Sequence, residues 1–170
     1  YTALEAYPQF QPDAALVATG NSRFINYWLE GLRWMEENYG LDGIYMDDVS
    51  FDRTTVKRSR KILERYHSGA RIDLHSNTAY SKGPANQYTE FFPYVDRLWF
   101  GESYRYDEMS PDEWFVTFSG IPFGEMSEML QGGGNRYLGM VYGATARHSW
   151  SSASNVKSPV PVWKFWDKFG

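Results

Sequence analysis

Adjacent carboxylates follow a short apolar run near residue 47. Residues 44–46 read Ile-Tyr-Met, which suits a buried strand. Asp47 and Asp48 come directly after this run, and Asp52 follows. Burying two like charges side by side costs free energy, so the pair would not stabilise a core. At the carboxyl end of a parallel strand it would instead lie among active-site loops. The sequence therefore predicts catalytic roles for Asp47 and Asp48. The alternative is that Asp48 or Asp52 caps the following helix.

Two further predicted strands also end in polar residues. Residues 70–75 alternate polar and apolar and end in His75, with Asn77 shortly after. Residues 97–102 end in Glu102. The carboxyl ends of parallel strands meet at one edge of a sheet, so we expect these side chains to lie near Asp47.

Two carboxyl groups on different strands of one rim fit glycoside hydrolysis. One acts as nucleophile or base and the other as proton donor, about 5–10 Å apart. Asp47 shares a strand face with Tyr45, and Glu102 lies two predicted strands away, which makes them one such pair. In a second arrangement, Asp47 or Asp48 orients a substrate N-acetyl group while the other donates the proton.

A third hypothesis is a metal-dependent hydrolase. Asp47, Asp73 and His75 offer the carboxylates and imidazole that suit divalent ions, although their spacing matches no specific metal motif. The sequence has no nucleophile-elbow motif and no cysteine, so Ser- or Cys-based acyl transfer has little support. A lone histidine on a strand is more often a hydrogen-bonding core residue or a substrate contact than a metal ligand, so the first expectation is no metal and no cofactor.

Composition limits the partners of this chain. Its net charge is −4 and no basic stripe is interleaved with aromatics, which argues against nucleic acid. No transmembrane run is present. Aromatic residues make up 18% of the sequence, and flat aromatic faces suit sugar-binding clefts. We expect a carbohydrate substrate, no nucleic acid and no membrane. The predicted substrate-binding residues are Tyr45, His75, Asn77, Trp99, Tyr104, Arg147 and Trp150.

Helical patterns separate the predicted strands and define the fold class. Strands near residues 44, 72 and 98 are about 27 residues apart, which is the βα repeat of a parallel sheet. We predict an α/β fold: a partial, TIM-barrel-like arrangement with about four to five βα units. An open doubly wound sheet is the alternative, but its glycine fingerprint is absent. Helices are predicted at 23–39, 52–66, 85–92, 110–118, 124–130 and 161–168, a weak strand at 16–19 and a last strand at 137–142.

The length predicts one domain that is shorter than a complete barrel. The chain has 170 residues, whereas an eight-unit barrel needs roughly 250. We expect residues 1–170 to form a single domain that is part of a larger barrel protein. A partial barrel exposes sheet edges and apolar helix faces, so self-association is expected. The sequence leaves open whether this fragment is active alone.

Five stretches of the chain resemble a known group of proteins. They are 40–53, 72–76, 98–102, 119–126 and 163–170. The group consists of bacterial glycoside hydrolase-like proteins with a domain related to the N-terminal part of glycoside hydrolase family 123. The resemblance spans about residues 16–170. It implies a (β/α) barrel within a larger, exported, carbohydrate-degrading protein, and hence an extracellular or periplasmic location.

The same resemblance bears on the catalytic residues. Characterised members of family 123 remove β-linked N-acetylgalactosamine with a neighbouring Asp-Glu pair. The similar pair here is Asp47-Asp48, so the second position departs from Glu. The substrate and the choice between Asp48 and Glu102 as proton donor stay open. A non-catalytic carbohydrate-binding or structural module is the alternative function.

Overall fold

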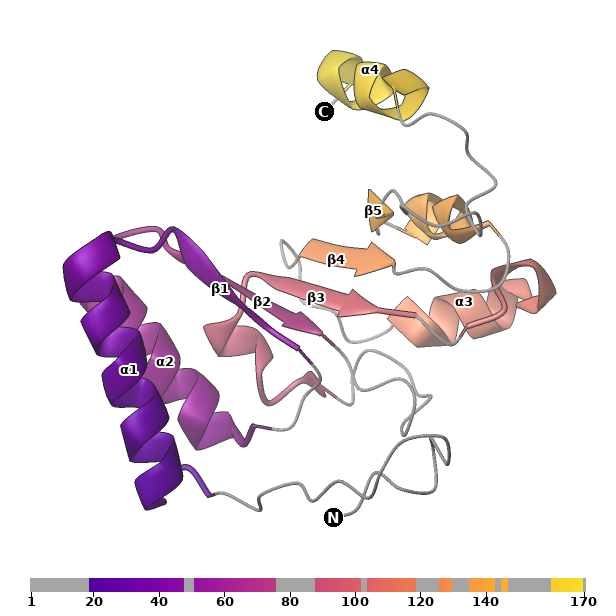
Figure 1. Cartoon of the computed structure of the whole chain (residues 1–170). Coiled ribbons are helices and arrows are strands. Elements are labelled where there is room, and N and C mark those ends of the chain that lie inside the picture. Colours follow the sequence, from indigo (N-terminus) through magenta and orange to yellow (C-terminus); the bar gives the residue numbers. More distant parts are fainter. Residues whose placement is uncertain are drawn as a thin grey trace, which may run out of the picture. The chain divides into compact units, whose positions relative to one another are not determined.

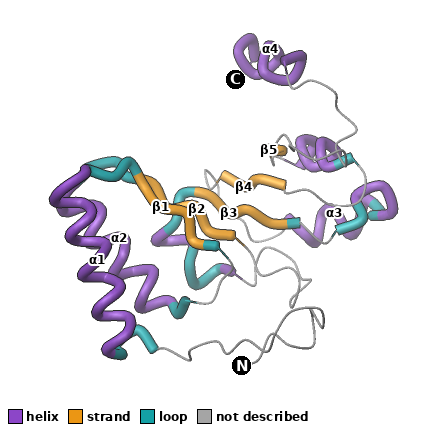
Figure 2. Tube along the Cα trace, viewed as in Figure 1, coloured by secondary structure: helices purple, strands orange, loops and turns teal. Residues whose placement is uncertain are grey.

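A computed structural model describes residues 19–47, 51–75, 88–101, 104–118, 126–129, 135–142, 145–146 and 160–169 (Figure 1). They belong to two compact units, one with the first two helices and one with the sheet. Figure 2 distinguishes the helices from the strands.

The helical unit consists of α1 (Arg23–Tyr39) and α2 (Arg53–Tyr66). Helix α1 begins after Ser22, whose Oγ accepts a hydrogen bond from the backbone N–H of Ile25 at 3.2 Å. It ends at Gly40, which has the left-handed φ of 63° that glycine adopts without strain. Both ends of α1 agree with the helix predicted at 23–39.

Asp52 caps α2 and joins it to the segment before α1. Its Oδ1 accepts hydrogen bonds from the backbone N–H and the hydroxyl of Thr55, both at 2.8 Å. Its Oδ2 accepts the N–H of Gly20 at 2.7 Å. Burial raises the pKa of Asp52, but the bonds from Thr55 and Gly20 and the charge of Arg58 outweigh it, so the net pKa is lowered. Asp52 therefore caps α2, which confirms for this residue the alternative that Asp48 or Asp52 caps the following helix.

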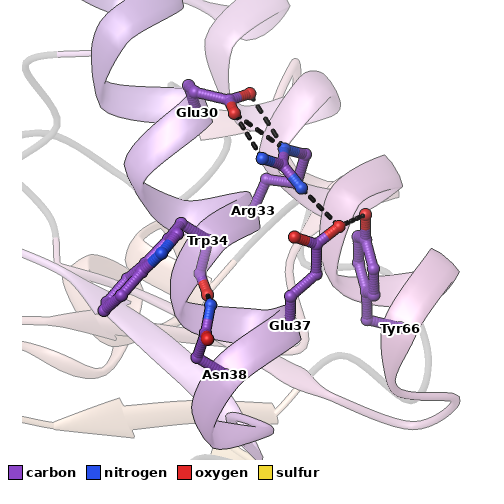
Figure 3. A network of polar contacts seen from close by, with 6 residues as sticks. All are labelled: Glu30, Arg33, Trp34, Glu37, Asn38 and Tyr66. Atoms are coloured by element: carbon purple, nitrogen blue, oxygen red, sulfur yellow. Dashed lines mark hydrogen bonds and ion pairs between the residues drawn. The ribbon is translucent and has the colours of Figure 1, made fainter.

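An exposed polar network connects the two helices (Figure 3). The Nε of Arg33 donates to both carboxylate oxygens of Glu30 at 2.9 Å, and its guanidinium also pairs with Glu37. The hydroxyl of Tyr66 on α2 donates to Oε1 of Glu37 at 2.6 Å. Arg33 and Tyr66 thus meet at one carboxylate, which links α1 to α2.

Glu36 of α1 and His67, the residue that follows α2, hold the turn after α1. The buried Glu36 accepts the N–H of Leu41 through Oε2 at 3.2 Å. The Nδ1 of His67 lies 2.9 Å from the carbonyl oxygen of Leu41, which accepts its hydrogen bond. The backbone N–H and carbonyl of Leu41 are therefore both hydrogen-bonded, just before the first strand.

In the described part of the sheet unit, five parallel strands follow one another in chain order. They are β1 (Gly43–Met46), β2 (Arg71–His75), β3 (Arg97–Phe100), β4 (Met126–Met129) and β5 (Thr145–Ala146). This sequential parallel order agrees with the partial βα arrangement predicted from the sequence, and β1 to β3 fall where three strands were expected.

Burial alternates along the first three strands. Met46, Ile72, Leu74, Leu98 and Phe100 are each at most 2% exposed, whereas the residues between them keep more exposure. One face of β1–β3 is therefore apolar and the other carries polar and aromatic side chains.

Aromatic side chains organise the segment after β3. Tyr106 is completely buried in η4, a 3₁₀ helix (Tyr106–Glu108), and its hydroxyl donates to the carbonyl of Gly101 at 2.6 Å. Its ring stacks on Trp114 of α3 (Pro111–Phe118), with centroids 5.8 Å apart. Trp114 stacks in turn on Tyr142, with centroids 5.7 Å apart. This stack fixes the chain where it leaves β3.

The predicted start of α3 is confirmed in detail. The N–H of Ser110 donates to Oε2 of Glu113 at 2.6 Å, and the N–H of Glu113 donates to Oγ of Ser110 at 3.3 Å. This reciprocal pair is a capping box. The last helix, α4 (Val160–Phe169), also agrees with its prediction.

Three predicted elements are wrong. Residues 126–129 of the predicted helix form β4, and their Met-Ser-Glu-Met alternation is the period of a strand. The predicted strand at 137–142 is η5, a 3₁₀ helix (Arg136–Tyr142), because a short apolar run does not distinguish helix from strand. Of the helix predicted at 85–92, residues 85–87 lie outside the described residues and residues 89–91 form a turn. Phe92 instead begins η3 (Phe92–Tyr94), a 3₁₀ helix with Pro93 in its first turn, where the missing N–H costs nothing.

The weak strand predicted at 16–19 falls outside the described residues except for Thr19. Among the helices that the structure describes, none combines the length and the apolar character needed to cross a membrane.

Candidate active site

The register of the sheet brings Asp47, His75 and Trp99 to one edge. Met46 pairs with Leu74, so Asp47, the next residue, comes alongside His75. His75 pairs with Trp99 on β3. Asp47 directly follows β1, His75 ends β2 and Trp99 is the last residue but one of β3, so all three lie near the carboxyl ends of parallel neighbours, as predicted from the sequence.

Asp47 presents an exposed carboxylate that is held by two neighbours. Its side chain is 73% exposed, whereas that of His75 is 12% exposed. The hydroxyl of Tyr45 donates to Oδ1 of Asp47 at 3.0 Å, which confirms that both share a strand face. The Nδ1 of His75 lies 2.7 Å from the same oxygen. A carboxylate accepts hydrogen bonds, so Nδ1 carries the proton of this contact.

The rings of Tyr45, His75 and Trp99 cluster at this edge. The ring centroid of Tyr45 lies 4.8 Å from that of Trp99 and 6.1 Å from that of His75, whose plane is inclined by 23° to it. Tyr45 itself is 46% exposed. The edge therefore combines a held carboxylate with an accessible aromatic face.

Asp73 and Arg97 form an ion pair on β2 and β3, two residues before His75 and Trp99. They are register partners, and Oδ2 of Asp73 lies 3.7 Å from Nη1 of Arg97. Burial and the nearby charge of Asp96 raise the pKa of Asp73, against the opposing effects of Arg97 and a hydrogen bond from Trp99. The sequence prediction did not include Arg97. The period-two pattern of 97–100, placed beside that of 70–75, was the signal that could have found it.

The metal hypothesis finds no ligand set in the described part of the chain. No three His or carboxylate side chains there are placed to hold a metal ion. Asp73, one of the three proposed ligands, is directed to Arg97 instead.

Comparison with protein families gives a match that covers most of the chain. Residues 1–149 match the family described as glycoside hydrolase 123, TIM-barrel domain. The chain belongs to this family. The match confirms the resemblance noted from the sequence, and it agrees with the parallel strand order. No curated protein and no solved structure matches the chain.

In TIM barrels the active site lies at the carboxyl ends of the strands. In this family 123 domain, that edge of β1–β3 carries Asp47, His75, Tyr45 and Trp99. Four predicted site residues are thus neighbours in the structure, and the arrangement matches the edge that the fold uses for catalysis.

Tyr104 packs within the aromatic segment of the family 123 domain. Its ring lies edge-on to Phe100 and to Tyr106, with centroids 6.3 Å apart in each case. Burial, followed by the neighbouring Tyr88, raises the pKa of its phenol to about 12. Its predicted stacking against substrate stays a prediction.

Five predicted site residues lie outside the described residues. They are Asp48, Asn77, Glu102, Arg147 and Trp150. Their roles stay predictions.

Proposed function

We propose that this family 123 barrel domain is the catalytic part of a glycosidase and that Asp47 is its principal catalytic carboxylate. One observation carries the proposal: Asp47 is 73% exposed at the carboxyl end of β1, yet its Oδ1 is held by Tyr45 and His75. Exposure allows contact with a substrate, and the two bonds favour one orientation of the charged group.

Glycoside hydrolysis assigns two tasks to such an edge. A protonated carboxyl group donates its proton to the glycosidic oxygen as the bond from that oxygen to the anomeric carbon breaks. An ionised carboxylate acts at the anomeric side, and we assign this task to Asp47. Asp47 then either attacks the anomeric carbon, activates a water, or orients an N-acetyl group whose carbonyl oxygen attacks that carbon. Water supplies the hydroxyl group of the released sugar in every case.

The proton donor distinguishes two forms of the proposal. Glu102 follows β3, two strands from β1, and would complete the two-carboxylate arrangement. Asp48 is adjacent in sequence and would complete the substrate-assisted arrangement. The substrate itself decides between them, because only a 2-acetamido sugar carries its own nucleophile.

The surroundings of Asp47 support a carbohydrate substrate. Tyr45 and Trp99 offer aromatic surface beside the carboxylate, with ring centroids 4.8 Å apart. The apolar face of a sugar ring would lie on this surface with its anomeric carbon towards Asp47. Export to the periplasm or the cell exterior is part of the same proposal, since polymeric carbohydrates are met there.

The test is hydrolysis of a panel of aryl glycosides, with 2-acetamido and 2-hydroxy sugars in matched pairs. The chain is compared with Asp47→Asn and with Asp42→Asn. Asp42 is exposed and precedes β1, so the control makes the same substitution at the opposite end of the same strand. We expect Asp47→Asn to lose about 10²–10⁴-fold in kcat/KM, the range for a positioned catalytic group.

Each result has a defined meaning. Loss of turnover in Asp47→Asn alone, with an unchanged circular dichroism spectrum, supports the proposal. Equal turnover in both variants contradicts it. Binding of sugars without any turnover by the unaltered chain would favour the non-catalytic module. Cleavage confined to 2-acetamido sugars would assign the substrate-assisted form.

A further inference from the structure

We propose that His75 is a positioning residue that orients the carboxylate of Asp47, and not a direct contact of the substrate. The proposal rests on the proposed role of Asp47. It replaces the role expected from the sequence, in which His75 binds a substituent of the sugar.

The neighbouring strands bring these residues together. β1 and β2 are parallel and pair as far as Met46 and Leu74, and Asp47 and His75 are the next residues along the two chains. The resulting separation of Nδ1 from Oδ1 is 2.7 Å, a short charge-assisted hydrogen bond. Asp47 directly follows the last paired residue of β1, and His75 is the last residue of β2, so the paired strands bring the two side chains to the same edge.

Asp47 and His75 differ in how much of each side chain is exposed. The side chain of Asp47 is 73% exposed and that of His75 only 12%. The imidazole therefore presents little surface to a ligand, whereas the carboxylate presents most of its surface. The ring of Tyr45 covers His75 in a stacked arrangement with centroids 6.1 Å apart, which limits rotation of the imidazole.

The hydrogen bond also sets the tautomer of His75. With Nδ1 donating to Asp47, the neutral ring carries its proton on Nδ1 and not on Nε2. An exposed aspartate without such a partner would sample several side-chain rotamers. The inference is that His75, together with Tyr45, confines Asp47 to one rotamer before substrate binds.

NMR spectroscopy determines the tautomer of His75, and this test requires no turnover. Long-range ¹H–¹⁵N correlation spectra of the full chain distinguish the two tautomers at a pH where the ring is neutral. The chain has three histidines, and single substitutions assign their signals. We expect the Nδ1–H tautomer at His75, changing to the Nε2–H form in Asp47→Ala. The Nε2–H form in the unaltered chain, or no change in Asp47→Ala, would overturn the proposal.

His67 is the internal control of that experiment. Its Nδ1 lies 2.9 Å from the backbone carbonyl of Leu41, within the helical unit. Since Asp47→Ala leaves that carbonyl in place, the signals of His67 should keep their tautomer while those of His75 change.

A pair of substitutions tests the same inference through kinetics. The amide nitrogen of Asn can take the place of Nδ1, and that of Gln can take the place of Nε2. We expect His75→Gln to lose about 10²-fold in kcat with little change in KM, as for a misplaced catalytic group. His75→Asn should lose clearly less. A raised KM in His75→Asn with near-normal kinetics in His75→Gln would show a substrate contact through Nε2 and overturn the proposal.

The outcomes separate this proposal from the proposed function. If the unaltered chain hydrolyses no sugar, the glycosidase proposal fails, and the tautomer measurement still decides the role of His75. If both His75 variants unfold, as judged by thermal denaturation, the spectra of the unaltered chain and of Asp47→Ala decide it.

Discussion

The carboxylate of Asp73 faces the guanidinium of Arg97 across β2 and β3, with 3.7 Å between Oδ2 and Nη1. The pair lies on the polar face of the sheet, next to Tyr45 in the register. Burial has the largest effect on the pKa of Asp73, which is raised even though Arg97 acts to lower it. The polar face of the sheet therefore holds a carboxyl group whose pKa is raised above its ordinary value.

Asp73 should make stability depend on pH. A raised pKa in the folded state stabilises the protein below the ordinary pKa of aspartate, and this contribution is lost as pH rises through the folded-state pKa. Asp73→Asn removes the titration. The stability of the variant relative to the unaltered chain should therefore increase with pH across that window, as measured by urea denaturation at a series of pH values. A pH-independent difference would contradict the shift.

Asp52 should show the opposite pH dependence. Its pKa is lowered in the folded state, so its contribution is present above the ordinary pKa of aspartate and is lost as pH falls through the lowered value. Asp52→Ala should cost about 0.5–2 kcal/mol at neutral pH, the usual value of a helix cap. Asp52→Asn retains a good capping side chain and should cost less. Equal stabilities of the Ala variant and the unaltered chain would disprove the capping role.

Two glycines give a matched test of the sheet. A Cβ at Gly43 would overlap the carbonyl oxygen of Arg71 and so push β1 away from β2. Gly43→Ala should therefore destabilise the protein by about 1–3 kcal/mol. Gly31 lies in α1 with nothing within 4 Å of an added Cβ, and Gly31→Ala should stabilise by about 0.5–1 kcal/mol. Melting temperatures that shift in the same direction for both variants would count against this packing of β1 on β2.

Tyr106 should be essential to the segment after β3. Its buried hydroxyl donates to the carbonyl of Gly101, which precedes Glu102. Tyr106→Phe leaves that carbonyl without this partner and should cost about 1–3 kcal/mol in the free energy of unfolding. Tyr27 is 80% exposed, and Tyr27→Phe is the control that should change little. Similar unfolding free energies for the two variants would refute a structural role for the Tyr106 hydroxyl.

Local chemistry explains which elements were predictable. Ser22 and Gly40 bound α1 through caps that involve only nearby residues, and Ser110 with Glu113 starts α3 in the same way. Such signals are visible in the sequence alone. The apolar run at 137–142 carries no comparable boundary signal, and it forms a 3₁₀ helix whose Tyr142 stacks on Trp114. That contact depends on a residue far away in the chain.

The candidate site was predictable only in part for a related reason. Alternation along each strand places Tyr45 and Asp47 on one face, and likewise Asp73 and His75. The bond between Asp47 and His75 depends on the register of β1 against β2, which no single strand encodes. The ion pair of Arg97 likewise depends on register, because its partner Asp73 lies on the neighbouring strand β2.

The most direct test of the central claim is the kcat/KM of Asp47→Asn relative to that of Asp42→Asn on the best aryl glycoside of the panel. If Asp47 is the catalytic carboxylate, the ratio should be about 10⁻² or lower, with both variants folded. A ratio near one, from two folded and active variants, would contradict the account.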